Sequence, residues 1–319
     1  MAAPPAIRIG VSSCLLGQAV RFDGGHKRNP LLVETFGRFV EWIPVCPEVE
    51  LGLGVPRETL RLTRTADGEV RMVTTKSGRD ITAQMREWSR ARTEALAGEG
   101  LSGYVLKKDS PSCGMERVTV SGGSGAALRT GRGLFAEALM ARFPRLPIED
   151  EGRLSDLRLR DNFVERAFAY RRLGALFAGR WQPDDLIRFH AVHELALLAH
   201  SPAIEAELAR LAARGTSMAR ADLEIRYRDR FMDAMATLAT TRKHANVLRR
   251  MAGRLAPLLG ADAWQELQSN LEDYRLGLAP LVVPLALIRR HVRRHRVEQL
   301  AGQVYLDPHP TELMLRNHA

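Results

Sequence analysis

The chain has 319 residues, of which 45% are hydrophobic, and this length favours two domains, each with a core of its own. No stretch approaches the roughly 18 consecutive apolar residues of a membrane span, and the amino terminus lacks a secretory pattern, so we expect a soluble, cytoplasmic protein without a membrane partner. Three cysteines are too few and odd in number for a disulfide framework, which leaves free thiols or metal ligands. The net charge of +10, from 47 basic and 37 acidic residues, favours a polyanionic partner.

Patterns typical of strands and of helices alternate through the first half of the chain. Strands are expected at AIRIGVSS, IPV, GYVLKK and LPIED, and helices at PLLVETFGRFVEW, TAQMREWSRARTEAL and GLFAEALMARF. This alternation predicts an α/β domain with a mostly parallel sheet. The segment TLRLTRTADGEVRMVT indicates an added antiparallel hairpin that turns at Asp67 and Gly68. The glycine-rich segment from Ser121 to Gly133 is expected to be a surface loop.

Strand patterns nearly vanish after about residue 152. We therefore expect an α/β N-terminal domain over residues 1–152, followed by an all-α C-terminal domain over residues 153–319. Helices should begin at Pro183 and Pro202, because proline in the first helical turn loses no needed hydrogen bond. A long helical segment is expected from about Arg220 to Leu259, and shorter ones over residues 263–276 and 281–296.

Each of the three cysteines, Cys14, Cys46 and Cys113, lies just beyond an expected strand. Because the carboxyl ends of parallel strands share one edge of the sheet, the three thiols should converge there. None belongs to a close-spaced Cys-x-x-Cys pair, which argues against an ordinary zinc ribbon. Three thiolates without a fourth fit a cubane iron–sulfur cluster with one open iron. Zinc held by the three cysteines with His26 or a carboxylate stays as the alternative.

Polar residues next to the cysteines are candidates for catalysis. Glu48, in VCPEVELG, should lie at the mouth of the crevice, where a low dielectric raises a carboxyl pKa toward a value useful for acid–base chemistry. Ser110 and Ser112 flank a proline that fixes a turn, and their hydroxyls are expected to contact cluster sulfur or substrate. Asp23, in RFDGGH, is either a turn former or a further acid.

Three segments, CLLGQAVRFDGG, PVCPEVELGLG and KKDSPSCG, resemble the motif blocks of the thiouracil desulfidase family in order and spacing, over roughly residues 7–150. The resemblance implies that Cys14, Cys46 and Cys113 hold a [4Fe-4S] cluster whose open iron captures the sulfur of the substrate. It also matches Glu48 to the family's Cys-Pro-Glu carboxylate and Ser112 to the serine before its third cysteine.

The second half is also similar to a known type of domain. RKHANVL, PLVVPLALI and QVYLDPHPTELMLRNH resemble a helical domain that is fused behind desulfidase-like domains. Chains with this fusion resemble the tRNA 4-thiouridine desulfidases, which implies tRNA as substrate and partner and uridine as product. Two alternatives stay open: a desulfidase of free thiouracil or thionucleosides, and a non-catalytic RNA-binding protein with a structural zinc site.

Contacts to tRNA phosphates are expected from basic side chains of the helical domain. The candidates are Arg242, Lys243, Arg249, Arg250, Arg289, Arg290, Arg293 and Arg294. Spacings of three and four place Arg289, Arg293 and Arg296 on one helical face, and Arg290 and Arg294 on the next. His291 and His295 are expected to continue this basic face rather than to bind zinc.

Overall fold

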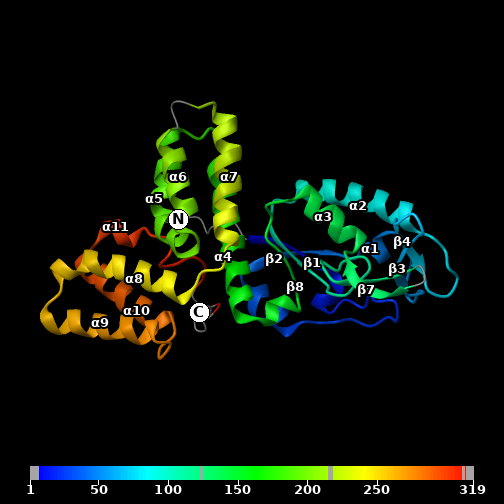
Figure 1. The fold of residues 1–319 in the computed structure, drawn as a ribbon, viewed down its shortest axis with the longest axis horizontal. Coiled ribbons are helices and arrows are strands. Elements are labelled where there is room, and N and C mark those ends of the chain that lie inside the picture. The colour runs from blue at the N-terminus through cyan, green and yellow to red at the C-terminus, as the bar shows by residue number, and fades with distance from the viewer. Residues whose placement is uncertain (1–6, 123–124, 215–217, 311–312, 314–319) are drawn as a thin grey trace. The chain divides into compact units, whose positions relative to one another are not determined.

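The computed structural model describes residues 7–122, 125–214, 218–310 and 313. The chain divides into two compact units, Met1–Ser155 and Asp156–Ala319. The first unit is an α/β domain and the second consists of helices, so the predicted fold classes are confirmed (Figure 1). Over the described residues, no helix has both the length and the apolar character that crossing a bilayer requires.

The first sheet of the α/β unit is parallel throughout. It consists of β1 (Ile7–Ser12), β2 (Val40–Val45), β5 (Leu101–Leu106) and β8 (Ile148–Asp150), in the order β2-β1-β5-β8. The central strands β1 and β5 are almost wholly buried, as expected for a sheet covered on both faces. Strand β2 lies at the edge, where its Pro44 is tolerated because an edge strand can spare a ladder hydrogen bond.

The second sheet is mixed. It consists of β3 (Leu60–Arg64), β4 (Val70–Thr74), β6 (Val118–Gly122) and β7 (Gly125–Gly131), in the order β4-β3-β6-β7. The hairpin of β3 and β4 is confirmed, and Gly68 in its turn has a φ of 89°. The loop expected from Ser121 to Gly133 is wrong over the described residues, because β6 and β7 form a second hairpin there. The parallel pairing of β6 with β3 gives this glycine-rich segment its backbone partners.

The described residues of the α/β unit form three α-helices, α1 (Pro47–Glu50), α2 (Thr82–Ala97) and α3 (Leu134–Arg142). Helices α2 and α3 lie side by side, with the rings of Trp88 and Phe135 5.6 Å apart (Figure 1). The helix expected at PLLVETFGRFVEW is wrong. One π-helical turn (Leu31–Thr35) and one 3₁₀ turn (Phe36–Arg38) precede β2, which starts at Val40 because all six residues of β1 pair with it.

Eight α-helices build the described part of the second unit. They are α4 (Leu157–Phe177), α5 (Pro183–His200), α6 (Pro202–Ala213), α7 (Arg220–Ala236), α8 (Thr241–Leu255), α9 (Ala261–Arg275), α10 (Val282–His295) and α11 (Glu298–Ala301). The predicted starts at Pro183 and Pro202 are confirmed. The prediction of one long helical segment from Arg220 is wrong, because two helices form there. Thr240 caps the second helix, and its side-chain oxygen accepts a hydrogen bond from the Lys243 backbone N–H at 3.4 Å.

Candidate functional site

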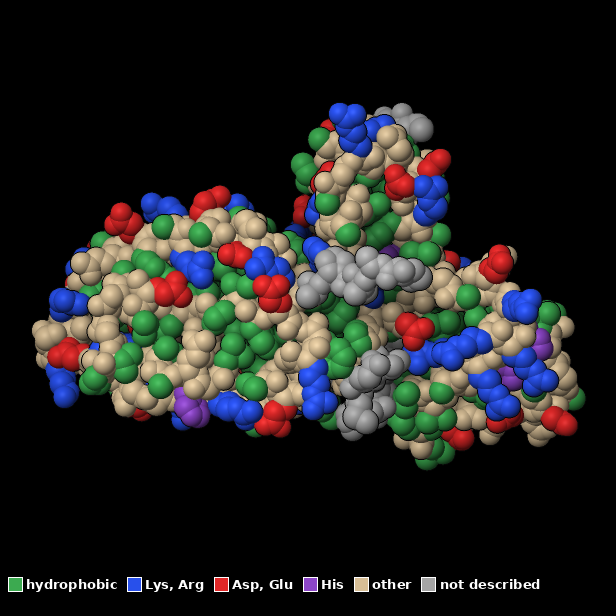
Figure 2. Space-filling model, turned by 180° about the vertical axis from the view of Figure 1, so that it is seen from behind, with side chains coloured by type: hydrophobic (Ala, Val, Ile, Leu, Met, Phe, Trp, Pro, Cys, Tyr) green, Lys and Arg blue, Asp and Glu red, His purple; other side chains and the backbone are tan. Residues whose placement is uncertain are grey.

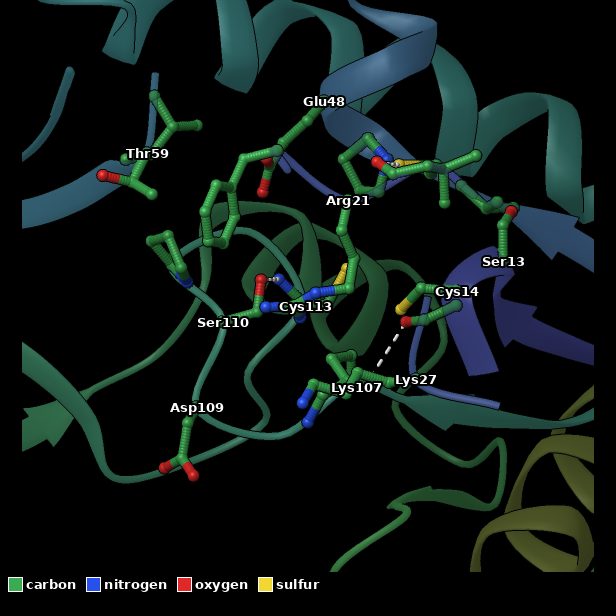
Figure 3. Close-up of a pocket in the computed structure, with 18 of the residues that line it drawn as sticks. Ser13, Cys14, Arg21, Lys27, Glu48, Thr59, Lys107, Asp109, Ser110 and Cys113 are labelled. Atoms are coloured by element: carbon green, nitrogen blue, oxygen red, sulfur yellow. Dashed lines mark hydrogen bonds between the residues drawn. The ribbon is translucent and has the colours of Figure 1, made fainter. Parts of the chain in front are cut away.

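The structure brings all three cysteines to one cavity. Cys14 lies in the 3₁₀ turn after β1, Cys46 follows β2 and precedes α1, and Cys113 lies in the loop between β5 and β6. They line a cavity of about 350 Å³, which we call the cysteine cavity, and Ser110 and Glu48 line it with them. Figure 3 shows the sulfur atoms of Cys14 and Cys113 directed into the same space, with Ser110 beside Cys113. This volume lies within the range of small-molecule sites.

Cys14 and Cys113 are buried, Cys46 is partly buried, and the three thiols influence one another. Burial raises the pKa of Cys14 to about 11 and raises the pKa of Cys46, and it raises the pKa of Cys113 well above its ordinary value. The charge of Cys46 adds to the shift at Cys14, and both add to the shift at Cys113, whereas Lys107 opposes the shift at Cys14. A cationic centre that binds these sulfurs must therefore displace their protons.

The loop that carries Cys113 is organised by its own serine. The Ser110 hydroxyl oxygen accepts hydrogen bonds from the backbone N–H groups of Ser112 and Cys113 at 3.2 and 3.1 Å, and the Gly114 N–H donates to the Ser110 carbonyl at 2.8 Å. The start of α3 packs so closely on this loop that a Cβ at Gly133 would stand 2.5 Å from the Ser112 backbone. Ser110 thus shapes the turn that directs Cys113 into the cavity.

Glu48 is bound from two sides. Its Oε1 accepts a hydrogen bond from the Ser112 hydroxyl at 2.9 Å, and its Oε2 accepts from the Arg57 guanidinium at 2.9 Å (Nε) and 2.8 Å (Nη2). Arg57 also donates to the carbonyls of Gly54 and Val20, each at 2.9 Å. The largely buried Glu48 carboxylate thus faces a guanidinium and a hydroxyl. Sequence reasoning missed Arg57, whose only signal is a basic residue in the loop after the Cys-Pro-Glu motif.

Asp23 and His26 lie outside the cysteine cavity. Asp23 is exposed, and its pKa is lowered chiefly because its carboxylate accepts the Gly25 N–H, at 3.0 Å. It is a turn former here, which was one of the two expected roles. His26 is exposed, and its Nδ1 lies 3.2 Å from the Arg28 backbone N–H that donates to it. Neither side chain lines the cavity with the cysteines.

Basic side chains surround the cysteine cavity. Arg21, Lys27, Lys107 and Lys108 line it, and Figure 3 shows Lys27 and Lys107 close together below Cys14. Lys107 forms an ion pair with Glu151. Because these cations lie at the rim of a partly apolar cavity, they give it a positive field that suits an anionic ligand.

The basic residues expected to contact tRNA fall into two groups. Lys243 donates to the His200 carbonyl at 2.5 Å, Arg289 donates to the Leu306 carbonyl and pairs with Asp307 at 3.3 Å, and Arg250 pairs with Glu194 at 2.5 Å. Arg249 donates to Asn246 of its own helix at 3.0 Å. The remaining four are exposed and make no ion pair within the described residues: Arg242, Arg290, Arg293 and Arg294. In Figure 2, Lys and Arg side chains gather, with histidine among them, over the part of the unit built by α8 to α10.

Two further expectations for this helix are wrong. Arg296 lies beyond the end of α10 with a φ of 52°, so it does not share a helical face with Arg289 and Arg293. His291 is 5% exposed and both its ring nitrogens lack hydrogen-bond partners, so it belongs to the packed interior and not to the basic face. Its ring stacks on His295 at 6.1 Å.

Comparison with known families matches the two halves of the chain separately. Residues 9–151 match the family described as 2-thiouracil desulfurase, and residues 195–310 match a family described as protein of unknown function, DUF1722. Thus the motif resemblance and the family match agree on the same part of the chain.

Three individual proteins are similar to parts of the chain. The uncharacterized protein YbgA of Escherichia coli (strain K12) is 28% identical over 161 residues, which cover 50% of this chain and 95% of YbgA. The uncharacterized protein YbbK of Bacillus subtilis (strain 168) is 32% identical over 149 residues, covering 44% of this chain and 95% of YbbK. Among solved structures, the [4Fe-4S]-dependent thiouracil desulfidase TudS is 31% identical, covering 48% of this chain and 97% of TudS with a TM-score of 0.37.

Proposed function

Because the chain belongs to the 2-thiouracil desulfurase family over residues 9–151, we propose that it is a [4Fe-4S]-dependent desulfidase that removes sulfur from 4-thiouridine in tRNA. The products are uridine and sulfide. The observation that carries the proposal is the meeting of three cysteines, from the ends of three strands, with Glu48 in one cavity. Desulfidation of free 2-thiouracil is the second candidate, because the family description names that base.

The donor set fits an iron–sulfur cluster, because the three cysteines of the cavity supply thiolates, the soft ligands that such clusters take. Among the described residues, no group of three or more His, Cys, Asp and Glu side chains is arranged to hold a single metal ion. A cubane cluster spreads its cysteines over several irons, so Cys14, Cys46 and Cys113 would each hold one iron and leave the fourth without a protein thiolate. When bound, the cluster supplies a soft Lewis acid that polarises a thiocarbonyl bond.

The chain's own residues supply the acid–base chemistry. The reaction is redox-neutral: a thiocarbonyl and water give a carbonyl and sulfide. Glu48 accepts a proton from the attacking water at a carboxylate oxygen, and the same group returns a proton to the departing sulfur. Arg57 and Ser112 hold that carboxylate in a fixed orientation. Ser110 orients the turn beside the bound base.

The helical unit binds the tRNA in this proposal. A stacked base must be turned out of the RNA to reach the cysteine cavity, which costs a few kcal/mol that backbone contacts offset. The exposed arginines Arg242, Arg290, Arg293 and Arg294 are the cations available for such contacts. Lys243 and Arg289 are not included, because their side chains donate to backbone carbonyls of the chain itself, those of His200 and Leu306.

Anaerobic purification followed by iron and acid-labile sulfide analysis tests the cofactor. We expect about four of each per chain, and loss of both in Cys46→Ser. The activity test incubates the loaded protein with tRNA that contains 4-thiouridine, and in parallel with 2-thiouracil, and measures sulfide and the released product. A colourless protein with one zinc would overturn the proposal, and conversion of 2-thiouracil alone would move the assignment to the second candidate.

A further inference from the structure

A second hollow adjoins the cysteine cavity. It has a volume of about 260 Å³ and is bounded by the loop after α1 and by the β3–β4 hairpin. Its lining residues are Leu53, Arg57, Glu58, Leu60, Thr74, Ser77 and Arg79. Arg57 and Leu60 also line the cysteine cavity, so the two spaces share a wall. We call this second space the flanking hollow.

The polar wall of the flanking hollow is fixed by contacts within the chain. The hydroxyls of Thr74 and Ser77 lie 2.7 Å apart, and the Ser77 hydroxyl donates to the Glu58 Oε2 at 2.9 Å. The Arg79 backbone N–H donates to the Thr74 hydroxyl oxygen at 2.8 Å. These bonds hold the hollow in shape before a ligand arrives, which lowers the entropy that binding would cost.

Two kinds of group remain available to a ligand there. Leu53 and Leu60 are only partly buried, so they leave an apolar surface on which a flat ring can lie. The Arg79 side chain is exposed, and its guanidinium forms neither an ion pair nor a hydrogen bond with any described residue. The Arg57 guanidinium is already occupied by Glu48 and two carbonyls, so it acts as wall and not as a ligand contact.

An apolar surface beside a free guanidinium matches a nucleotide, whose base is flat and whose phosphate is anionic. We propose that the flanking hollow binds the nucleotide next to the thiolated one, so that the substrate is a polynucleotide chain and not a free base or nucleoside. This inference rests on the proposed function, since it assumes that the thiolated base enters the cysteine cavity. A free thiobase fills the first space only and gains nothing from the second.

Kinetics with two substrates of different length test the inference. One substrate is the 4-thiouridine nucleoside, and the other is a trinucleotide with 4-thiouridine in the middle. The wild-type chain should convert the trinucleotide with the higher kcat/KM. Arg79→Ala should lower the ratio of the two kcat/KM values by about tenfold, the effect of losing one phosphate contact of about 1.4 kcal/mol, and the loss should appear in KM.

The matched control is Arg61→Ala, because Arg61 is exposed on the same hairpin and lines neither space. A second reading that needs no turnover is the fluorescence anisotropy of a labelled, unmodified trinucleotide, whose affinity should fall in Arg79→Ala and not in Arg61→Ala. If Arg79→Ala lowers kcat/KM equally for both substrates, or for neither, the flanking hollow does not bind a neighbouring nucleotide, and the proposed desulfidase activity is unaffected by that result. If wild-type chain with a full iron and sulfide content converts neither substrate, the proposed function itself fails.

Discussion

Glu48 and Arg57 form a pair that is largely withdrawn from water. Their side chains are 16% and 6% exposed, and the guanidinium reaches the carboxylate through two nitrogens. Removal of one partner from such a pair leaves the other charge buried without compensation, which costs far more than loss of a surface ion pair. The geometry of Glu48 is therefore set by the fold and does not depend on a substrate.

If the chain is the proposed desulfidase, Glu48→Gln should abolish turnover without loss of iron and sulfide. The amide keeps the size of the side chain but cannot accept a proton, so we expect a loss of about 100-fold or more in single-turnover desulfidation. Iron and sulfide content should be unchanged, because no cysteine is altered. Glu34→Gln is the control, since Glu34 is exposed and pairs with Arg28 outside the cavity. Retained activity in Glu48→Gln would remove this residue from the mechanism.

A double-mutant cycle measures how strongly Arg57 holds Glu48. Arg57→Ala and Glu48→Ala should each lower the free energy of unfolding by about 3 kcal/mol, and the double variant by less than the sum, with a coupling of about 1–3 kcal/mol. Urea unfolding followed by circular dichroism gives these values. The control is the pair of Arg142 and Glu94, which is 2.9 Å apart with side chains 43% and 71% exposed, and it should couple far more weakly because water screens it. Equal couplings for the two pairs would contradict the argument.

Sequence reasoning located the residues of the cavity that follow strand ends. The sequence predicted that the three cysteines meet, because the carboxyl ends of parallel strands lie at one edge of the sheet. Arg57 could not be predicted in this way, because its link to Glu48 depends on the path of a loop whose course no periodicity describes. Asp23 was a candidate that lies outside the cavity, because a carboxylate that forms a turn cannot be told from a catalytic one in the sequence.

At the scale of the element, helix α5 contains a histidine that the fold keeps neutral. The His193 ring stacks on Phe189 at 4.0 Å, and its Nδ1 donates to the Phe189 carbonyl at 2.7 Å. Its Nε2 is buried without a partner. Burial lowers the pKa of His193 to about 3, so protonation of this ring is strongly opposed in the folded helix.

Stability of the helical unit should therefore fall in acid. The folded pKa of His193 lies below the unfolded value of about 6.5, so the unfolded chain binds more protons between these values and stability rises with pH. The contribution of neutral His193 to the free energy of unfolding is complete above about pH 6.5. As the pH falls toward 3, up to about 1.4 kcal/mol of it is lost per pH unit. Urea unfolding at pH 7.5 and 5.0 should show this loss, and His193→Phe should reduce it.

His295→Phe is the control for this experiment, because His295 is only partly buried on α10. If wild type and His193→Phe lose the same free energy of unfolding between pH 7.5 and 5.0, other groups are responsible for the loss. His190 is one such group, since burial also lowers its pKa.

Elements with a clear pattern in their own residues were predicted well, and glycine-rich or edge strands were not. Helix α2 shows its helical period, and strand β5 its continuous buried run, within their own residues. Strands β6 and β7 do not, because glycine-rich residues become strands only through pairing with β3. The start of β2 was mistaken for a helix for the same reason, since its six residues are defined by their partners in β1.

At the scale of the whole molecule, each unit has hydrophobic clusters built from its own elements. The change from alternating to helical patterns was enough to predict this division. The net charge was not enough to predict which cations are available to a partner, because Lys243 and Arg289 donate to backbone carbonyls of the chain itself. The exposure of each basic side chain and its partners in the folded structure distinguish cations that bind within the chain from cations that are available to a partner.

The proposed binding of tRNA should depend on the exposed arginines of α10. Replacing Arg290, Arg293 and Arg294 together by Ala should weaken binding at every salt concentration. The slope of log affinity against log salt should fall by about two to three, since each phosphate contact contributes about 0.9. Gel retardation with bulk tRNA at several salt concentrations measures the slope.

The control replaces Arg188 and Arg275 by Ala, because these arginines are exposed but pair with Asp185 and Glu272. An unchanged slope in the triple variant would show that α10 does not contact the RNA backbone. An equal drop in the control would show a general effect of net charge instead of a defined surface.

Pro44 has a consequence beyond its place in β2. The outer rim of a sheet exposes unpaired amide groups, to which a strand of a second molecule can attach and start a growing aggregate. A proline in the outermost strand offers no N–H for such an attachment, and its ring obstructs a neighbour. The residue two positions before Cys46 thus removes one point of attachment from the edge strand that delivers this cysteine to its cavity.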